Sequence, residues 1–298
     1  LNDAWYNPAT AGQGVFVNVF PELGKVFIAM FTFDESGAAE GASATLGGPG
    51  QRWLTAIGDF TGNRVELDVG YTTGGVFDSA TPAPNTVGGQ GTLVLEFSDC
   101  GAGTLSYDLP GAGVSGTIPL ERVVKDNEAL CDALTDGELS ADERAALPTV
   151  AGSGFVMNPG LNDAWFNPAT AGQGVLMTVF PGSDQLFLAK FTFDTEPGTG
   201  DAVIGGAGQR WFTAIGPITG NRATLDVANT TGGAFDAAAP GQATETGQGT
   251  VTVEFGDCAS ATLGYALPGA EAADTLSGSI DLQRVVSENA ALCASLGN

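Results

Sequence analysis

Hydrophobic and polar residues alternate along several short runs of this chain, and Gly, Pro, Asn or Asp bound each run. In one run, Phe27, Ala29, Phe31 and Phe33 fall on a single face. This period of two is typical of β-strands, because successive side chains of a strand point to opposite sides of a sheet. We predict strands at 14–21, 25–34, 51–58, 63–72, 91–98, 103–109 and 115–124, a short strand near 42–47, and a helix near the end of each half of the chain, at 126–134 and 288–296.

The two halves of the sequence resemble each other closely. The stretch "LNDAWYNPATAGQGV" begins at Leu1, and "LNDAWFNPATAGQGV" begins at Leu161, with Tyr6 replaced by Phe166. The motifs "FTFD", "QRW", "TGNR", "TTGG", "DC" and "RVV" then follow in the same order in both copies. A repeat of this length indicates duplicated domains rather than a solenoid, whose repeats span about 20–50 residues. We predict a first domain at 1–134, a linker at 135–160 and a second domain at 161–298.

The final strand of each copy favours a closed barrel. Open sheet edges promote aggregation, so a meander of this length closes into a barrel or folds as a sandwich. Ile118, Leu120 and Arg122 share one face of the last strand, and Arg284 repeats this position in the second copy. An inward guanidinium at a barrel end needs a partner, and the ring of Trp5 can stack on it for about 0.5–2 kcal/mol. We therefore predict an all-β protein of two tandem antiparallel β-barrel or barrel-like sandwich domains, each with a short C-terminal helix.

The linker contains a helix signal and a weaker metal signal. Ser140 followed by Glu143 is a capping box, which predicts a short helix that ends at Pro148. The segment from Asp132 to Glu143 also has the shape of a calcium loop, with Asp132, Asp136 and Glu143 as candidate ligands. The third position of that loop is a leucine, which removes an oxygen that calcium needs. The capped helix is the favoured interpretation, and calcium is the only cofactor that we consider.

Composition limits the classes of partner. The chain of 298 residues carries 34 acidic and 10 basic residues, giving a net charge of −24. Such a surface repels phosphate backbones, so we expect no nucleic-acid binding. No run approaches the ~18 apolar residues that a membrane helix requires, so we expect no membrane insertion. Self-association, other surface proteins, or a glycan or small ligand are the partners that remain.

The four cysteines indicate an oxidising compartment. Four cysteines allow three pairings, and the duplication favours Cys100–Cys131 and Cys258–Cys293. Disulfides persist outside the cytosol, so we expect a secreted or cell-surface protein.

Catalytic groups are scarce. The sequence contains no histidine, which excludes Ser-His-Asp and Cys-His machinery and every histidine metal site. Six acidic positions recur in both copies, but most fall at strand ends or in outward phase, where turn formation and solubility explain them. A glycosidase would need two of them facing each other across a cleft. We therefore expect no enzyme.

The polar and aromatic residues shared by both copies form the candidate site. These are Trp5, Asn7, Gln13, Gln51, Arg52, Trp53 and Arg122, with counterparts Trp165, Asn167, Gln173, Gln209, Arg210, Trp211 and Arg284. The tryptophans can stack on a sugar or another ring, or they can pack at barrel corners with the indole N–H bonded locally. The loss of the Tyr6 hydroxyl in the second copy favours a scaffold role for the opening stretch.

Some strands are apolar on both faces. Val26 and Ile28 lie opposite the Phe27 and Phe31 face, and only one face can fill a barrel. The other face must meet the neighbouring copy, another chain or a ligand, which predicts an association surface. A strand-like segment, Phe155, Val156 and Met157, precedes only the second copy. If it completes the second sheet, the first domain lacks an edge strand that another molecule could supply.

Two resemblances add to this interpretation. Trp5 with Arg122, and Trp165 with Arg284, resemble the first-strand Trp and last-strand Arg of calycins, the lipocalins and avidins, which implies a barrel that a helix can follow. The motifs "W[YF]NPATAGQG", "QRW" and "TTGG.F" with the late Cys are similar to a family of secreted proteobacterial proteins, which implies a bacterial, exported protein.

The sequence therefore predicts a non-enzymatic extracellular structural or surface-assembly protein, such as an appendage, filament or matrix subunit. The alternative is a secreted binding module for a carbohydrate or small hydrophobic ligand, held at a barrel mouth or between the domains near the tryptophans.

Overall fold

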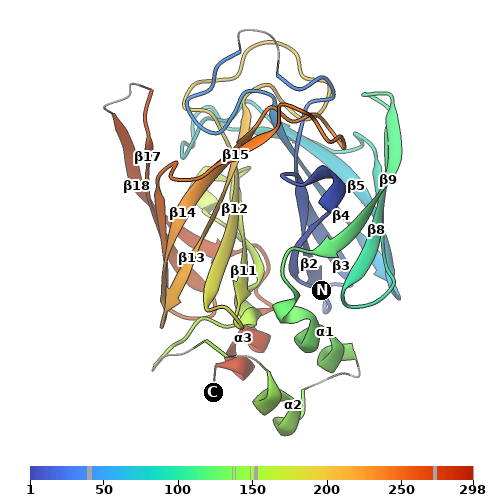
Figure 1. The fold of residues 1–298 in the computed structure, drawn as a ribbon, viewed down its shortest axis with the longest axis vertical. Coiled ribbons are helices and arrows are strands. Elements are labelled where there is room, and N and C mark those ends of the chain that lie inside the picture. The colour runs from blue at the N-terminus through green and yellow to red at the C-terminus, as the bar shows by residue number, and fades with distance from the viewer. Residues whose placement is uncertain are drawn as a thin grey trace.

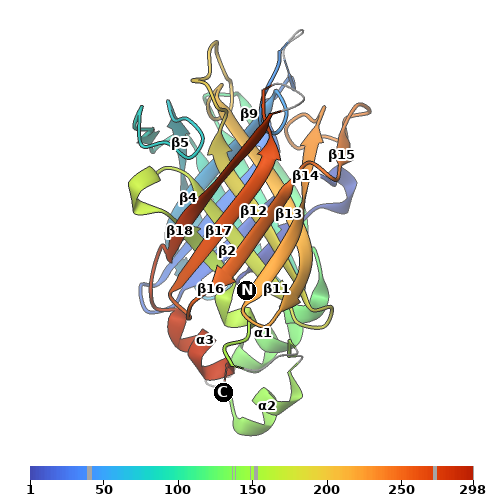
Figure 2. The same ribbon diagram turned by 90° about the vertical axis from the view of Figure 1, so that its left-hand side faces the viewer.

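Two closed antiparallel barrels of eight strands each stand side by side (Figure 1). The computed structural model describes residues 1–38, 42–135, 137, 139–147, 149–150, 154–270 and 274–297. Figure 2, which faces the second barrel, shows strands running obliquely around it, with loops at one end and helices at the other. The all-β prediction of two tandem barrel domains is confirmed, and the barrel rather than the sandwich is the form adopted.

The two barrels have matching strands in the same order. The first consists of β1 (Asp3–Tyr6), β2 (Gly14–Phe20), β3 (Lys25–Phe33), β4 (Gln51–Thr61), β5 (Arg64–Thr73), β7 (Thr92–Phe97), β8 (Ala102–Leu109) and β9 (Val114–Arg122), with β6 (Asn85–Val87) beside β5. The second consists of β10 (Asp163–Phe166), β11 (Gly174–Phe180), β12 (Gln185–Phe193), β13 (Gln209–Thr219), β14 (Arg222–Thr231), β16 (Thr250–Phe255), β17 (Ser260–Pro268) and β18 (Thr275–Arg284), with β15 (Ala243–Glu245) beside β14. Pairing of β4 with β5, and of β13 with β14, closes each barrel.

The predicted strand list needs three corrections. Trp5 lies inside a short first strand, β1, rather than before the first strand. Strand β6 was not predicted, because three exposed residues give too short a pattern. Residues 42–47 form no strand, and Leu46 of this loop is buried in the other barrel.

Inward-facing aliphatic side chains fill both barrels. Val26, Ile28 and Met30 of β3 point into the first barrel, and Leu186 and Leu188 of β12 point into the second. The phenylalanines of these strands therefore point outward. The apolar second face that the sequence predicted is real, and its partner is the other barrel.

An ion pair and a stacked ring close the helical end of each barrel. The guanidinium of Arg122 lies 4.5 Å from the ring of Trp5, and Arg284 lies 4.6 Å from that of Trp165, as predicted. The sequence did not predict the acidic partner: Asp3 pairs with Arg122, and Asp163 pairs with Arg284 at 2.5 Å. Burial raises the pKa of Asp163 to about 6, against the opposing effect of Arg284.

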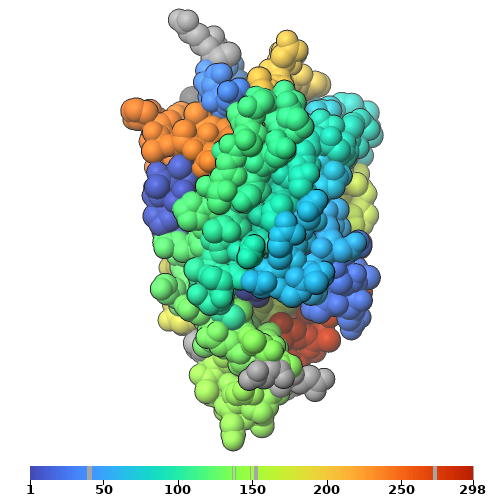
Figure 3. Space-filling model, turned by 90° about the vertical axis from the view of Figure 1, so that its right-hand side faces the viewer, coloured from blue at the N-terminus to red at the C-terminus, as the bar shows by residue number. Residues whose placement is uncertain are grey.

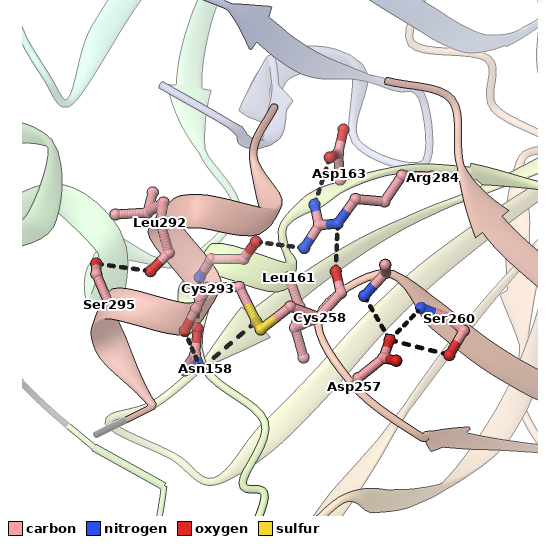
Figure 4. Close-up of a disulfide and its surroundings, with 12 residues drawn as sticks. Asn158, Leu161, Asp163, Asp257, Cys258, Ser260, Arg284, Leu292, Cys293 and Ser295 are labelled. Atoms are coloured by element: carbon pink, nitrogen blue, oxygen red, sulfur yellow. Dashed lines mark hydrogen bonds and ion pairs between the residues drawn. A yellow bond between two sulfur atoms is a disulfide. The ribbon is translucent and has the colours of Figure 1, made fainter. Parts of the chain in front are cut away.

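Two disulfides fasten the terminal helices to the same end. Cys100–Cys131 holds α1 (Glu128–Thr135), and Cys258–Cys293 holds α3 (Ala290–Leu296), so the predicted pairing is confirmed. Figure 4 shows the second disulfide beside Arg284, whose Nε donates to the carbonyl of Cys258 over 2.5 Å.

The linker forms the predicted capped helix, α2 (Ala141–Ala146), with the Ser140–Glu143 capping box. Pro148 lies outside the described residues. Of the calcium candidates, Asp132 lies in α1, Glu143 is engaged by Ser140, and Asp136 lies outside the described residues. Within the described part of the chain, no group of three or more acidic or cysteine side chains is placed to hold a metal ion.

Phe155, Val156 and Met157 do not form the strand that the sequence suggested. Met157 is buried against the second barrel core, and its N–H donates to Gly220 over 3.1 Å. Both barrels close without this segment, so the hypothesis of a missing edge strand is wrong. None of the described helices has the length and apolar character needed to span a membrane.

Candidate binding groove between the barrels

The barrels pack through the outer faces of β1–β4 and β10–β13. This interface cluster consists of Ala4, Phe16, Ala29, Phe31, Phe33, Trp53, Ala164, Leu176, Ala189, Phe191, Phe193 and Trp211. The ring of Trp53 lies 5.0 Å from that of Phe191, and the ring of Trp211 lies 5.9 Å from that of Phe31. These aromatic pairs come from opposite barrels, so the outward phenylalanines of each barrel are packed on the other.

Reciprocal hydrogen bonds accompany this apolar contact. Gln51 Oε1 accepts from the backbone N–H of Trp211 over 3.0 Å, and Gln209 Oε1 accepts from the backbone N–H of Trp53 over 3.2 Å. The indole of Trp53 donates to Thr192, just as the indole of Trp211 donates to Thr32. Each contact occurs twice with the partners exchanged, which is the pattern of a two-fold symmetric interface.

Loops of each barrel also close the open end of the other. Phe77 and Leu46 of the first copy belong to the core of the second barrel. Phe235 and Ile204 of the second copy belong to the core of the first barrel. We call these four side chains the plug residues. They occupy the barrel mouths, one of the two places where the sequence predicts a ligand.

The neighbours of the plug residues are held by polar contacts. The Tyr265 hydroxyl donates to Asp78, and that of Tyr107 donates to Asp236, each over 2.8 Å. Asp34 accepts from the backbone N–H of Ile204 over 3.2 Å and pairs with Arg52 at 2.9 Å. Its counterpart Asp194 does the same for Leu46 and pairs with Arg210. These carboxylates therefore fix loops.

The duplicated opening stretch forms a clamp between the barrels. The Asn7 side chain caps the 3-10 turn Pro8–Thr10, and Gly12 then adopts a φ of +92°, which favours glycine. Gln13 accepts from the N–H of Asp236 in the other copy over 3.2 Å. Figure 3 shows the dark-blue opening turn against the orange segment of the second copy, where Gln242 donates to Ala11.

Beside this clamp, the interface leaves a groove with a volume of about 250 Å³. We call it the first groove; the residues that line it are Ala4, Trp5, Tyr6, Ala11, Gly12, Gln13, Gly14, Val15, Phe16, Phe31, Val123, Phe187, Ala189, Trp211, Thr213, Thr230 and Thr244. Its walls are mainly apolar and come from both barrels. Thr213 and Tyr6 are half-buried at its edges, and Val123 is exposed beside it.

Two larger hollows are poorer candidates. One of about 740 Å³ lies between the loops at 42–50 and 194–207, and its guanidinium groups, Arg52 and Arg210, are already paired with Asp34 and Asp194. Another of about 300 Å³ lies against the linker, where the described residues are interrupted between Val150 and Gly154. The first groove, by contrast, is bordered by strands of both barrels and by the clamp.

The structure separates the predicted site residues into groups. Gln51, Trp53, Gln209 and Trp211 meet at the barrel interface, and Arg52 and Arg210 lie above it in their ion pairs. Gln13 and Gln173 belong to the two clamps, as do Asn7 and Asn167.

Trp5, Trp165 and their arginines close the barrel ends and do not meet the other groups, although the ring of Trp5 also forms part of the groove wall. Sequence reasoning missed Phe187 and Thr213 as groove residues. The sequence feature that could have indicated them is the presence of apolar residues on both faces of their strands.

The repeat-matched acids are engaged in structural contacts rather than paired across a cleft. Asp99 and Asp257 accept from backbone N–H groups of their own turns, which lowers the pKa of both carboxyls. Comparison with protein-family models, curated proteins and solved structures finds no match.

Proposed function

We propose that this protein is an exported, non-catalytic binding module that holds a small apolar ligand in the first groove. One observation carries the proposal: aromatic rings and small residues from both barrels line a hollow of about 250 Å³ at the interface. An apolar concave pocket with a few polar groups at its edge is the usual form of a small-molecule site.

Two further observations support the proposal. The acids that a hydrolase would need are engaged with arginines, loops and turns, which favours a non-catalytic role. The two disulfides are compatible with an extracellular location, as the resemblance to secreted proteobacterial proteins implies.

The test fills the groove with a side chain. Thr213→Phe places a ring inside the first groove, while Thr55→Phe changes the matching position of β4 in the other barrel. Tryptophan fluorescence is followed during titration with indole, 1-naphthol and decanol. We expect saturable binding by the wild type and by Thr55→Phe, and at least a tenfold loss of affinity in Thr213→Phe. Equal affinities in all three proteins, or no saturable binding, would overturn the proposal.

The structural or surface-assembly role stays a second proposal, because exposed apolar residues occur in matched pairs. Ile57 and Ile215 occupy matching positions of the two copies, as do Val123 and Val285, and all four side chains are exposed. Ile215 pairs with Phe187 across the strands, and Ile57 pairs with Phe27. Two equivalent exposed apolar surfaces would let each molecule bind two others. Light scattering and electron microscopy at high concentration should then show linear polymers, and a uniform monomer would exclude this role.

A further inference from the structure

We infer that the protein binds one ligand per chain, a small neutral molecule with an apolar body and a hydroxyl or carbonyl group, and that Phe16 keeps its site open. This inference rests on the proposed function and specifies it. The clamp and the interface are duplicated, so two grooves would be expected. Side-chain differences between the copies make them unequal.

The inequality is visible at two matched glycines. Gly14 pairs with Phe31 in the first barrel, and Gly174 pairs with Phe191 in the second, in the same register. A Cβ placed on Gly174 would lie 2.4 Å from the Phe191 ring, so that ring covers the glycine. A Cβ on Gly14 would meet the Trp5 carbonyl at 2.9 Å and the Tyr6 Cβ at 3.7 Å as its closest neighbours, with no Phe31 atom so near.

Burial agrees with this placement. Gly174 is buried, whereas Gly14 is only half-buried and lines the first groove. The Phe191 ring therefore occupies, in the second copy, the space above the glycine that stays open in the first.

Phe16, which precedes the inward-facing Val17 of β2, explains why the rings of Phe31 and Phe191 are placed differently. Phe16 lies edge-on to Phe31 at 5.8 Å and stacks on Phe187 at 5.6 Å with an interplanar angle of 16°. These contacts hold Phe31 away from Gly14. The matching residue in β11 is Leu176, which has no ring to present an edge to Phe191. Phe16 is thus a positioning residue for the groove.

The lining defines the chemistry of the ligand. None of the described residues that line the first groove carries a charge. A charged ligand would lose its hydration there without gaining an opposite charge, and the net charge of −24 further disfavours anions. The hydroxyl group of Thr213 can bond one polar group of a ligand, whereas that of Thr244 is already hydrogen-bonded to Thr230 over 2.9 Å.

The size of the groove limits the ligand. The volume of about 250 Å³ lies just below the range of about 300–1,000 Å³ that is usual for small-molecule pockets, so we expect a ligand no larger than indole or naphthol. A peptide strand or helix would not fit inside it.

Calorimetry with 1-naphthol and with naphthalene-1-sulfonate, its anionic analogue, tests each part. For the wild type we expect one 1-naphthol per chain and at least tenfold weaker binding of the sulfonate. Phe16→Leu copies the second barrel, so it should let Phe31 cover Gly14 and weaken 1-naphthol binding at least tenfold. Leu176→Phe, the reverse change on the other side, should leave the affinity of the first groove unchanged. Circular dichroism confirms that both variants fold.

The outcomes separate this inference from the proposed function. Suppose that Thr213→Phe abolishes binding. The binding function then stands, but the inference is overturned if the wild type binds two ligands per chain, if it binds the sulfonate equally well, or if Phe16→Leu keeps the affinity. No saturable binding of any neutral or charged probe would overturn both.

Discussion

At the scale of single residues, the second barrel buries an amine where the first buries a thioether. Lys190 points into the second barrel at the place where Met30 points into the first. Its Nζ lies 5.6 Å from the ring of Phe77, one of the plug residues. Burial lowers the pKa of Lys190 from 10.5 to about 8, although the carboxylate of Asp78 acts in the opposite direction. The folded protein therefore disfavours the charged amine.

Lys190→Met should stabilise the protein at pH 7. The unfolded amine keeps its ordinary pKa, so the cost of burying the charge is complete below pH 8 and disappears as the pH rises through 10.5. We expect the free energy of unfolding to rise by about 1–3 kcal/mol at pH 7, and the gain to shrink at pH 9.5. Urea unfolding at both pH values measures this. Met30→Lys should have the opposite effect, and a less stable Lys190→Met at pH 7 would show that attraction to Phe77 and Asp78 outweighs burial.

At the scale of elements, α3 depends on one covalent link and a few contacts. The helix Ala290–Leu296 spans seven residues, which is too short to be stable alone. Cys293 is fully buried, and Asn158 donates to its carbonyl over 3.2 Å, as Figure 4 shows. The disulfide therefore positions the helix over the barrel end near Arg284.

Replacing Cys258 and Cys293 by serine should lower the free energy of unfolding by about 3 kcal/mol, because the unfolded chain loses a closed loop. Amide exchange should accelerate in α3 and around Trp165 while the strands far from this end stay protected. Differential scanning calorimetry and hydrogen exchange give the two results. Uniform acceleration across the second barrel would contradict a local role for the link.

The sequence predicts elements whose signal lies within a few neighbouring residues. The alternation in β3 and β9, the capping box of α2 and the Trp5–Arg122 contact all follow from local patterns, and the structure contains each of them. The strand near 42–47 was a wrong prediction because Leu46 is apolar for another reason: it fills the mouth of the opposite barrel.

The candidate site is harder to predict than the fold. The apolar outer face of β3 indicated an association surface, but sequence could not show which of three partners covers it. The first groove depends on Phe16 and Phe187, which are far apart in the chain and stack on each other only because the barrels pack. Their contact is set by tertiary geometry, which periodicity does not report.

At the scale of the whole molecule, the barrels are interlocked rather than merely tethered. Each supplies plug residues to the core of the other, and Trp53 and Trp211 are buried between them. Separating the barrels would expose both cores and this aromatic interface to water. Each disulfide lies within one barrel and its helix, so none joins the two halves covalently.

Cutting the linker should therefore leave the molecule intact. A protease site inserted after Leu139 separates α1 from α2, and α2 stays with the second half because Arg144 donates to Ser295. We expect both fragments to elute together in size-exclusion chromatography and to unfold in one transition, since the core of each barrel includes plug residues of the other. Phe77→Asp with Phe235→Asp places a charge in each core, so the cut double variant should separate. Separation of the cut wild type without denaturant would show that the linker, and not the interlocked interface, holds the barrels together.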